Sequence, residues 1–378
     1  MIELKCQVRE LVEKLTMLSK VKMGSKKNFA SLACRIPFAG CCELCLSEKV
    51  HRNNNYMYSD YYAYIDLQEC VGQGMFVFPD FTAVLTALKT LDKNDLVLMK
   101  YDKDVIKIIF GEDVIYENYS SEPDDSYIKI LNTFEFEIGV NLSSRCFDYI
   151  SDLLTVIPPT KKLSDTFFNS VVFDKHPIKS NCLLLMRTDS MRLMYYDVPL
   201  EFEWPLGGVV VPRDVIAWLS KLKKKSSEAV IMKQHGDYIS FEYDAYRLVC
   251  GIEKTFPPVI DFIKLDVDCN VTLVTEPLIK AVEYVTLGDI NRAITIKAKN
   301  QEAVVYSYDD EARKRSLNCE LNSDKEFELS IVSQFLLSIL KKCGYQVSIS
   351  RLLSNNFYKI TSPYKDFYYV VGCCKKNY

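Results

Sequence analysis

The stretch 209–232, VVVPRDVIAWLSKLKKKSSEAVIM, has the pattern of a strand, an amphipathic helix and a second strand. It opens with a run of β-branched residues, which favours a strand. Pro212 follows, at a position where the first turn of a helix tolerates a residue without an N–H group. Residues 229–232 form the next apolar run. Between the two runs, apolar residues recur at helical spacing, at Val215, Ile216, Leu219 and Leu222.

The same pattern occurs twice more in the chain. Residues 76–99 read FVFPDFTAVLTALKTLDKNDLVLM, and residues 327–350 read FELSIVSQFLLSILKKCGYQVSIS. Pro79, Pro212 and Ser330 occupy the equivalent position, so the copies lie 133 residues apart (from 79 to 212) and 118 residues apart (from 212 to 330). Such distances are too long for a solenoid repeat and suit one domain per copy. The sequence therefore predicts three tandem copies of one domain.

Two polar, proline-containing segments mark the predicted boundaries, SSEPDDS at 120–126 and EKTFPPV at 253–259. We place the domains at residues 1–125, 126–254 and 255–378. Each should hold two helices packed on short antiparallel strands, which is an α+β plan. Two charged or polar segments, 51–60 and 309–315, are predicted to be turns between strands.

Composition sets limits on the function. Apolar residues make up 48% of the 378 residues, with 13 Gly and 13 Pro, so the chain can bury real cores. It contains no apolar run near the ~18 residues that span a membrane, and MIELKCQVRE has charges where a signal peptide needs an apolar core. An intracellular protein is the simplest interpretation. The net charge of −3 means that any nucleic-acid binding must come from local groups of Lys and Arg.

Several short motifs resemble those of one protein family. Thr188-Asp-Ser-Met-Arg-Leu193 is similar to the turn TDGHRL, with departures at Ser190 and Met191. VVVPR at 209–213 is similar to VIVPRK, and TFPP at 255–258 to the linker G-K/R-F-P-D. FEL…L at 327–340 resembles EIGFNxxYLLDxL, and YVV at 369–371 the ending YVVMPM. These motifs occur in the same order in the bacterial sliding clamp, the beta subunit of DNA polymerase III, so the chain resembles a divergent member of that family.

The resemblance implies three DNA-clamp domains that form half of a ring. Two copies would join head to tail as a homodimer and encircle double-stranded DNA without reading its sequence, as a non-catalytic processivity factor in the cytoplasm, on the nucleoid. No cofactor and no metal are implied. The helices would line the ring, and residues on their outward stripes and in the loop after the first helix would contact DNA. The predicted DNA-binding residues are Lys20, Lys22, Lys26, Lys27, Arg213, Lys221, Lys224, Lys341 and Lys342.

In that family, DNA polymerase, the clamp loader and other replication proteins dock short linear peptides between the second and third domains. The positions that carry over are Phe168, Thr188, Met191, Arg192, Leu193, Pro257, Phe262, Val370, Cys373 and Cys374. An apolar groove with a few polar anchors suits a peptide with Leu and an aromatic residue. Gly372, Cys373 and Cys374 replace the bulky M-P-M of the family, so the pocket should have an altered shape.

Three alternatives remain open from the residues. A phage- or plasmid-encoded clamp could serve only its own polymerase, and a clamp-like scaffold need not encircle DNA. A hydrolase or metal enzyme would need a site among Cys34, Cys41, Cys42, Cys45 and His51. Cys42 and Cys45 form a C-x-x-C, but an odd separation on a predicted strand points them to opposite faces, and no second pair completes four zinc ligands. We expect the 14 cysteines to be structural thiols and the three His to lie in solvated turns.

Overall fold

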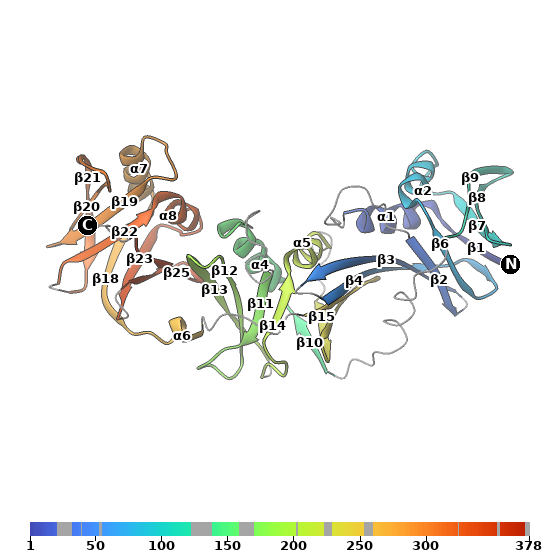
Figure 1. Ribbon diagram of the computed structural model, residues 1–378, viewed down its shortest axis with the longest axis horizontal. Helices are drawn as coiled ribbons and strands as arrows, with labels where there is room; N and C mark the ends of the chain where they lie inside the picture. The colour runs from blue at the N-terminus through green and yellow to red at the C-terminus, as the bar shows by residue number, and fades with distance from the viewer. Residues whose placement is uncertain are drawn as a thin grey trace. The chain divides into compact units, whose positions relative to one another are not determined.

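The computed structural model describes residues 1–20, 32–38, 40–52, 55–121, 138–158, 170–201, 203–222, 229–252, 260–323, 325–353 and 356–374. The chain forms two compact units. Most of their helices and strands are labelled in Figure 1. The first unit contains residues 1–147 and 213–253, and the second contains 148–212 and 254–378. The division passes through the predicted second domain.

The first unit contains a five-stranded antiparallel sheet and the two helices α1 (Val8–Leu18) and α2 (Phe81–Leu88). Helix α2 begins after Asp80, whose carboxylate accepts hydrogen bonds from the backbone N–H groups of Thr82 and Ala83. This cap satisfies two of the free donors of the first turn. The strands lie in the order β5 (Glu69–Val71), β1 (Ile2–Gln7), β7 (Leu96–Asp102), β8 (Val105–Phe110) and β9 (Asp113–Tyr119).

An eight-stranded antiparallel sheet completes the first unit, together with helix α5 (Arg213–Leu222). In it β17 pairs with β4, from Tyr246 opposite Ala63 to Cys250 opposite Ser59, so a strand of the predicted second domain continues the sheet of the first. The strand order is β10 (Ile138–Leu142), β15 (Val230–His235), β16 (Tyr238–Tyr243), β17 (Tyr246–Gly251), β4 (Asn55–Asp66), β3 (Cys41–Arg52), β2 (Leu32–Phe38) and β6 (Gly74–Phe78).

The second unit is built on a twelve-stranded antiparallel sheet. Strand β13 pairs with β25, from Arg192 opposite Val371 to Tyr196 opposite Phe367, which joins the predicted second and third domains. The order is β14 (Val209–Pro212), β11 (Ser170–Lys175), β12 (Cys182–Thr188), β13 (Arg192–Pro199), β25 (Lys365–Gly372), β24 (Phe357–Ser362), β23 (Gln346–Leu352), β18 (Val267–Val274), β21 (Asp310–Leu321), β20 (Glu302–Ser307), β19 (Ala293–Lys299) and β22 (Phe327–Val332).

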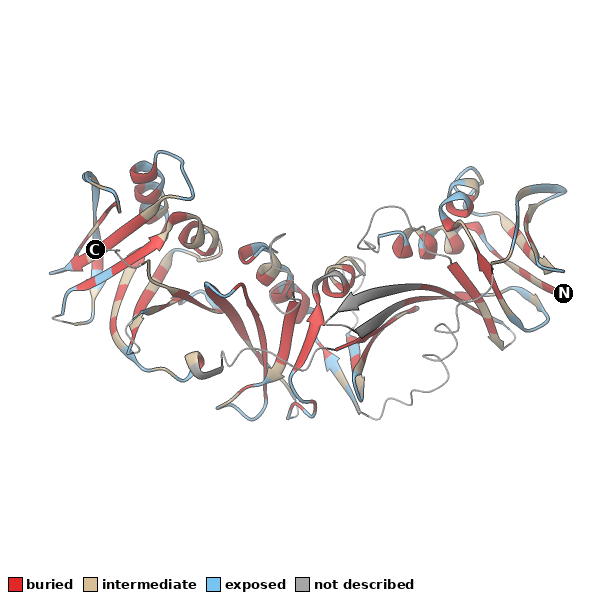
Figure 2. Ribbon diagram, in the orientation of Figure 1, coloured by how far each residue is buried: buried red, intermediate tan, exposed pale blue. Residues whose placement is uncertain are grey.

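Helices α6 (Ile260–Ile263), α7 (Thr275–Thr286) and α8 (Ser333–Leu340) belong to the second unit, and the division between the units passes through α4 (Ser144–Val156). The helices of the predicted first and third domains bury one face against their sheets (Figure 2). In α8 the buried face includes Leu336 and Leu340, as the helical spacing predicts.

All three copies of the repeated pattern fold as a strand, a helix and a strand: β6-α2-β7, β14-α5-β15 and β22-α8-β23. Pro212 is the last residue of β14, so its predicted place in the first turn of α5 is wrong by one position. Ser330 lies within β22, three residues before α8 begins at Ser333. The three-domain division stays a prediction, because strands of the predicted second domain pair with both neighbours.

Two predicted turns are strands. Residues 51, 52 and 55–60 belong to the long hairpin of β3 and β4, which pair from Cys41 opposite Asp66 to Arg52 opposite Asn55. Residues 310–315 begin β21, which pairs with β20. Polar composition suggested turns, but antiparallel pairing supplies the backbone hydrogen bonds and leaves one face free for polar side chains.

Trp218 on α5 connects that helix to other parts of the first unit. It is buried, and its indole Nε1 donates a hydrogen bond of 3.2 Å to the carbonyl of Met17, near the end of α1. Its ring packs edge-on against Tyr61 at 5.3 Å and against Tyr246 at 6.1 Å, measured between ring centroids. One side chain therefore ties α5 both to α1 and to the sheet.

We expect Trp218→Ala to lower the free energy of unfolding by about 3–5 kcal/mol, because it leaves a large cavity. Trp218→Phe keeps most of the apolar contact and loses the hydrogen bond to Met17, so its loss should be about 1–2 kcal/mol. Urea unfolding followed by circular dichroism measures both, with the exposed Tyr345→Ala as control. Equal losses for the two Trp218 variants would contradict this account of the packing.

Candidate functional site

The turn between β12 and β13 is shaped by its own side chains. Asp189 Oδ1 accepts hydrogen bonds from the backbone N–H groups of Met191 (3.2 Å) and Arg192 (3.1 Å). The Thr188 hydroxyl donates to the Arg192 carbonyl at 2.8 Å and accepts from the Ser190 N–H at 3.3 Å. Ser190 has a φ of +72°, in the left-handed region that few residues adopt without local support. Hydrogen bonds among its own residues therefore hold the turn in shape. Met191 is 58% exposed at its tip.

Arg192 connects this turn to helix α8. Its Nε lies 2.9 Å from Asp189 Oδ2, its Nη1 lies 3.4 Å from the Ser338 hydroxyl, and its guanidinium stacks 4.3 Å from the ring centroid of Phe335. Both members of the ion pair are buried. Burial acts to lower the pKa of Arg192, but Tyr369 and Asp189 outweigh it and raise that pKa above its ordinary value. Arg192 is thus a fixed internal cation.

Beside the turn lies an apolar cluster that includes Leu193 and Val370, which face each other across β13 and β25. Both are almost fully buried. The partly buried side chains packed against the cluster are Phe262, Leu265, Phe357 and Tyr368. Phe262 and Phe357 meet edge to face, with ring centroids 4.7 Å apart. Leu193 and Val370 therefore form the base of this surface, and the partly exposed aromatic rings are what a ligand would meet.

The C-terminal strand is joined to the turn through its backbone. The Gly372 N–H donates a hydrogen bond to the Met191 carbonyl in the turn, at 3.2 Å. The next two N–H groups bond elsewhere: that of Cys373 to the Asn356 carbonyl at 2.9 Å, and that of Cys374 to the Ser330 carbonyl at 2.9 Å. Burial raises the pKa of the thiols of Cys373 and Cys374, so both stay protonated.

We call the surface formed by Met191, Phe262, Leu265, Phe357 and Tyr368 over this cluster the β13–β25 site. Of the ten residues predicted to bind a peptide, Met191, Leu193, Phe262 and Val370 lie at this surface or in its base. Thr188 closes the turn, Arg192 faces α8 on the opposite side of the sheet, and the backbone N–H groups of Cys373 and Cys374 bond to Asn356 and Ser330. Phe168 and Pro257 lie outside the described residues. The sequence analysis did not select Phe357 or Tyr368, because they belong to no motif. Phe357 and Lys359 are alternate residues of β24, and Tyr368 and Val370 are alternate residues of β25. Each pair therefore shares one face of its strand, which was the signal available in the sequence.

Two of the predicted DNA-binding residues meet at the end of α1. Lys221 on α5 donates from Nζ to the backbone carbonyl of Lys20 at 3.1 Å. A cation at the C-terminal end of a helix is stabilised by the helix dipole. Next to Lys20 is a hollow of about 210 Å³, which Arg9 and Lys93 also line, together with Val12, Glu13, Thr16 and Met17. Arg9 and Lys93 are basic groups that the sequence analysis did not select.

The remaining predicted DNA-binding residues fall into four groups. Lys341 is exposed at the C-cap of α8. Lys342 lies 2.6 Å from Asp152, which also accepts a hydrogen bond from the Tyr196 hydroxyl, so its charge is largely neutralised. Arg213 is the first residue of α5, but its side chain lies outside what the structure describes. Lys22, Lys26, Lys27 and Lys224 are outside the described residues.

The cysteines considered as possible zinc ligands lie in different surroundings. Cys34 and Cys42 are buried with their sulfur atoms 3.1 Å apart, whereas Cys45 belongs to an apolar cluster with Tyr62 and Val249. Among the described residues, no group of three or more His, Cys, Asp or Glu side chains is placed to hold a metal ion.

The expectation of solvated histidines in turns is wrong about the turns for His51 and His235, and about the solvation for His176. His51 lies in β3 and His235 ends β15. His176 is buried, and its Nδ1 accepts hydrogen bonds from the N–H groups of Ile178 (3.1 Å) and Lys179 (2.9 Å). Burial, partly opposed by Asp197, lowers the pKa of His176, so the ring is neutral near pH 7.

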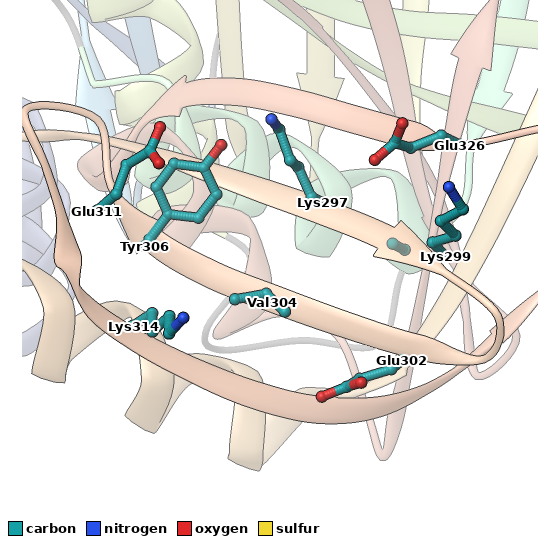
Figure 3. A pocket seen from close by; sticks show the side chains of 9 residues that line it. Lys297, Lys299, Glu302, Val304, Tyr306, Glu311, Lys314 and Glu326 are labelled. Atoms are coloured by element: carbon teal, nitrogen blue, oxygen red, sulfur yellow. The ribbon is translucent and has the colours of Figure 1, made fainter.

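A further hollow, of about 340 Å³, lies on the sheet of β19, β20 and β21 (Figure 3). Its charged lining residues are Lys297, Lys299, Lys314, Glu302, Glu311 and Glu326, so ammonium and carboxylate groups balance. The mixture gives no preference for a ligand of either charge.

Comparisons with known proteins identify the fold. No protein-family model matches the chain, and no curated protein sequence is similar to it. Solved structures match over the full length. A protein from Eubacterium rectale described as a DNA polymerase III beta subunit has 15% identity and a TM-score of 0.79, with 100% of each chain covered. The Caulobacter crescentus beta subunit has 16% identity and a TM-score of 0.78, with 99% of this chain and 100% of that chain covered. The Pseudomonas aeruginosa subunit has 14% identity and a TM-score of 0.77, with 99% of each chain covered.

The chain therefore has the fold of the bacterial DNA polymerase III beta subunits, the sliding clamps, at low sequence identity. This confirms the predicted fold class, in which helices pack on large antiparallel sheets as they do in the sliding clamps. In the described part of the chain, every helix is too short or too polar to span a bilayer.

The buried ion pair of the turn yields a prediction for stability. Asp189→Ala should lower the free energy of unfolding by about 3–5 kcal/mol, because it leaves the Arg192 cation buried without its carboxylate. Urea unfolding at pH 7 measures the loss. The matched control is Glu276→Ala, which breaks the exposed pair with Lys280 and should leave the midpoint unchanged. A similar response of the two variants would show that the turn does not depend on this pair.

Proposed function

From the fold of a beta sliding clamp, we propose that this protein is a non-catalytic processivity factor. Two copies join head to tail into a ring around duplex DNA, and the ring tethers a DNA polymerase that docks a peptide on the β13–β25 site. The observation that carries the proposal is the full-length match of the fold, with 99–100% of both chains covered. The surfaces described below support it independently.

One supporting feature is the edge strand β9 of the first unit. It ends the five-stranded sheet, so in the described part of the chain one side of its backbone is unpaired. Exposed acidic residues lie at and before it: Glu112, Asp113 and Glu117. Val114 and Tyr119 on the same strand are 48% and 73% exposed. An unpaired strand with exposed apolar side chains can pair with another chain.

The complementary feature is strand β21 of the second unit. It pairs with β20 along most of its length but with β18 only from Cys319 to Leu321, so its first half has an open side in the described residues. That half carries the basic run Arg313, Lys314 and Arg315, and the Arg315 guanidinium stacks 4.0 Å from the ring centroid of Tyr284. The neighbouring apolar residues Tyr284, Leu287 and Ile290 are 45%, 68% and 46% exposed.

These two edges fit each other in chemistry. The β9 edge offers Glu112 and Asp113, with Glu117 paired to Lys107, and the β21 edge offers Lys314 and Arg315, with Arg313 paired to Asp310. Each edge also has exposed apolar side chains, which mark protein-interaction surfaces. Contact between the first unit of one copy and the second unit of the next is heterologous, and two such contacts close a two-membered ring. Closure also covers both open strand edges.

A closed ring needs only weak contacts with DNA to stay on the duplex. The hollow with Arg9, Lys20 and Lys93, and the exposed Lys341, provide basic groups for phosphates. Contacts of this kind ignore base sequence and weaken as salt rises. Enclosure, and not affinity, then keeps the ring on the duplex.

Retention on end-blocked DNA tests this function without a loading protein. Rings thread onto a linear duplex from its ends, and streptavidin bound to terminal biotins then closes both ends. We expect the protein to stay on blocked DNA through a wash in ~1 M NaCl, where the Debye length is about 3 Å, and to leave once a restriction enzyme frees an end. Complete loss from blocked DNA in that wash would contradict encirclement and favour a clamp-like scaffold.

Charge reversal tests the proposed contact between copies. Arg315→Glu places a carboxylate opposite the acidic β9 edge and should lower capture of an untagged copy by a tagged one by about tenfold, or about 1.4 kcal/mol. Glu117→Lys on the partner copy should restore part of the loss. The control is Lys365→Glu, an exposed reversal on β25. Equal capture by the wild type and Arg315→Glu would place the interface elsewhere.

A further inference from the structure

We propose that Cys34 and Cys42 form a modification site, at which a hydroperoxide oxidises the two thiols to a disulfide that joins β2 to β3. The site lies in the first unit, and it does not depend on the proposed function. It emerges from a C-x-x-C motif whose two cysteines face apart, so that one of them meets a different partner.

The strand register brings the two thiols onto one face of the sheet. Cys34 on β2 lies opposite Leu44 on β3, and Cys42 is two residues from Leu44, so the two side chains point to the same side. Their sulfur atoms lie 3.1 Å apart. A disulfide bond is about 2.05 Å long, so the bond closes when each sulfur moves by roughly half an ångström.

The neighbouring cysteines of β3 are turned away from this pair. Cys45 is three positions from Cys42 and therefore lies on the opposite face, in the apolar cluster with Tyr62 and Val249. Cys41, next to Cys42 in the same strand, also points to that other side. The pair that the fold offers is thus Cys34 with Cys42, and not Cys42 with Cys45.

One further thiol, that of Cys6 on β1, is close enough to interact with Cys42. Cys6, Cys34 and Cys42 are all fully buried. Burial raises the pKa of Cys6, and the Cys42 thiol raises it further. In the described part of the chain these thiols are not placed as the ligands of one metal ion. Two-electron oxidation is therefore the chemistry that suits the two sulfur atoms in contact.

The hydrogen bond between the two thiols sets the order of the steps. It raises the pKa of Cys42 well above its ordinary value, and burial adds to the effect, so Cys42 keeps its proton. Cys34 then attacks the hydroperoxide: an S–O bond forms, the O–O bond breaks, and the Cys34 proton goes to the leaving oxygen. Cys42 attacks the resulting sulfenic acid, and its hydroxyl leaves as water with the Cys42 proton. The two sulfurs lose two electrons, which the hydroperoxide gains.

Burial makes the first step slow and the second step fast. The thiolate is the reactive form, so a covered and protonated thiol meets peroxide less readily than an exposed one. The second step is intramolecular between atoms already in contact, so the disulfide closes before another oxidant arrives. The fold therefore favours a disulfide over further oxidation of Cys34 to a sulfinic acid.

Peptide mapping of the folded protein tests the site. The protein is held in hydrogen peroxide near pH 7, the remaining thiols are alkylated in denaturant, and the chain is cut with trypsin. Because trypsin cuts after Arg35, the disulfide joins a peptide that ends at Arg35 to one that contains Cys42. We expect this to be the dominant link and dithiothreitol to remove it. Protein oxidised after unfolding in urea is the control, since its 14 cysteines should link without that preference.

Matched variants identify the sulfur atoms. Cys42→Ala should abolish the link, whereas Cys45→Ala, which lies in the same peptide and on the opposite face of the same strand, should preserve it. Oxidation should also raise the melting temperature of the wild type by about 5 °C, because the bond constrains the unfolded chain. The melting temperature of Cys42→Ala should not rise.

Three results would overturn the proposal. One is an oxidised wild type without the Cys34–Cys42 link, and another is a link of Cys42 to Cys6 in its place. The third is a linked protein that does not melt above the reduced one, because the bond would then need a structure other than this one. The map and melting curve of the wild type decide the question even if Cys42→Ala fails to fold.

Discussion

Backbone pairing between strands that are far apart in the sequence is the constraint on which the rest of this structure depends. Strand β17 pairs with β4, and β13 pairs with β25, so the predicted second domain contributes strands to the sheets of both neighbours. Every strand edge joined in this way is an edge that cannot pair with a foreign chain. Among the strand edges that stay open in the described part of the chain, β9 carries exposed acidic and apolar side chains, and the first half of β21 carries a basic run with exposed apolar residues beside it.

The same pairing builds the β13–β25 site. It sets the turn 188–193 beside the C-terminal strand, and α6 supplies Phe262 to the same cluster. Arg192 then holds the turn against α8 from the opposite face of the sheet, while Leu193 and Val370 form the apolar base. A site of this kind has its backbone fixed by the sheet, and its specificity comes from the few side chains left accessible, among them Met191 and Phe357.

The sequence predicted much of the fold because the repeated pattern changes period, from two in the strands to 3.6 in the helices, and does so three times. It predicted the turn at Asp189 and the strand at Val370 from motifs. It did not predict that residues 55–60 and 310–315 are strands. Their polar composition suggested turns, but an antiparallel sheet can expose one face to solvent and so can contain polar residues. Nor could it show that Lys342 pairs with Asp152 or that His176 is buried, since the partners of long or buried polar side chains lie far away in the sequence.

The mass of the protein in solution, measured by sedimentation equilibrium at micromolar concentration, tests most directly whether the open edges meet between copies. The account predicts a species of about twice the chain mass of 43.6 kDa. A strict monomer across that range would contradict it, because a single copy cannot close around a double helix.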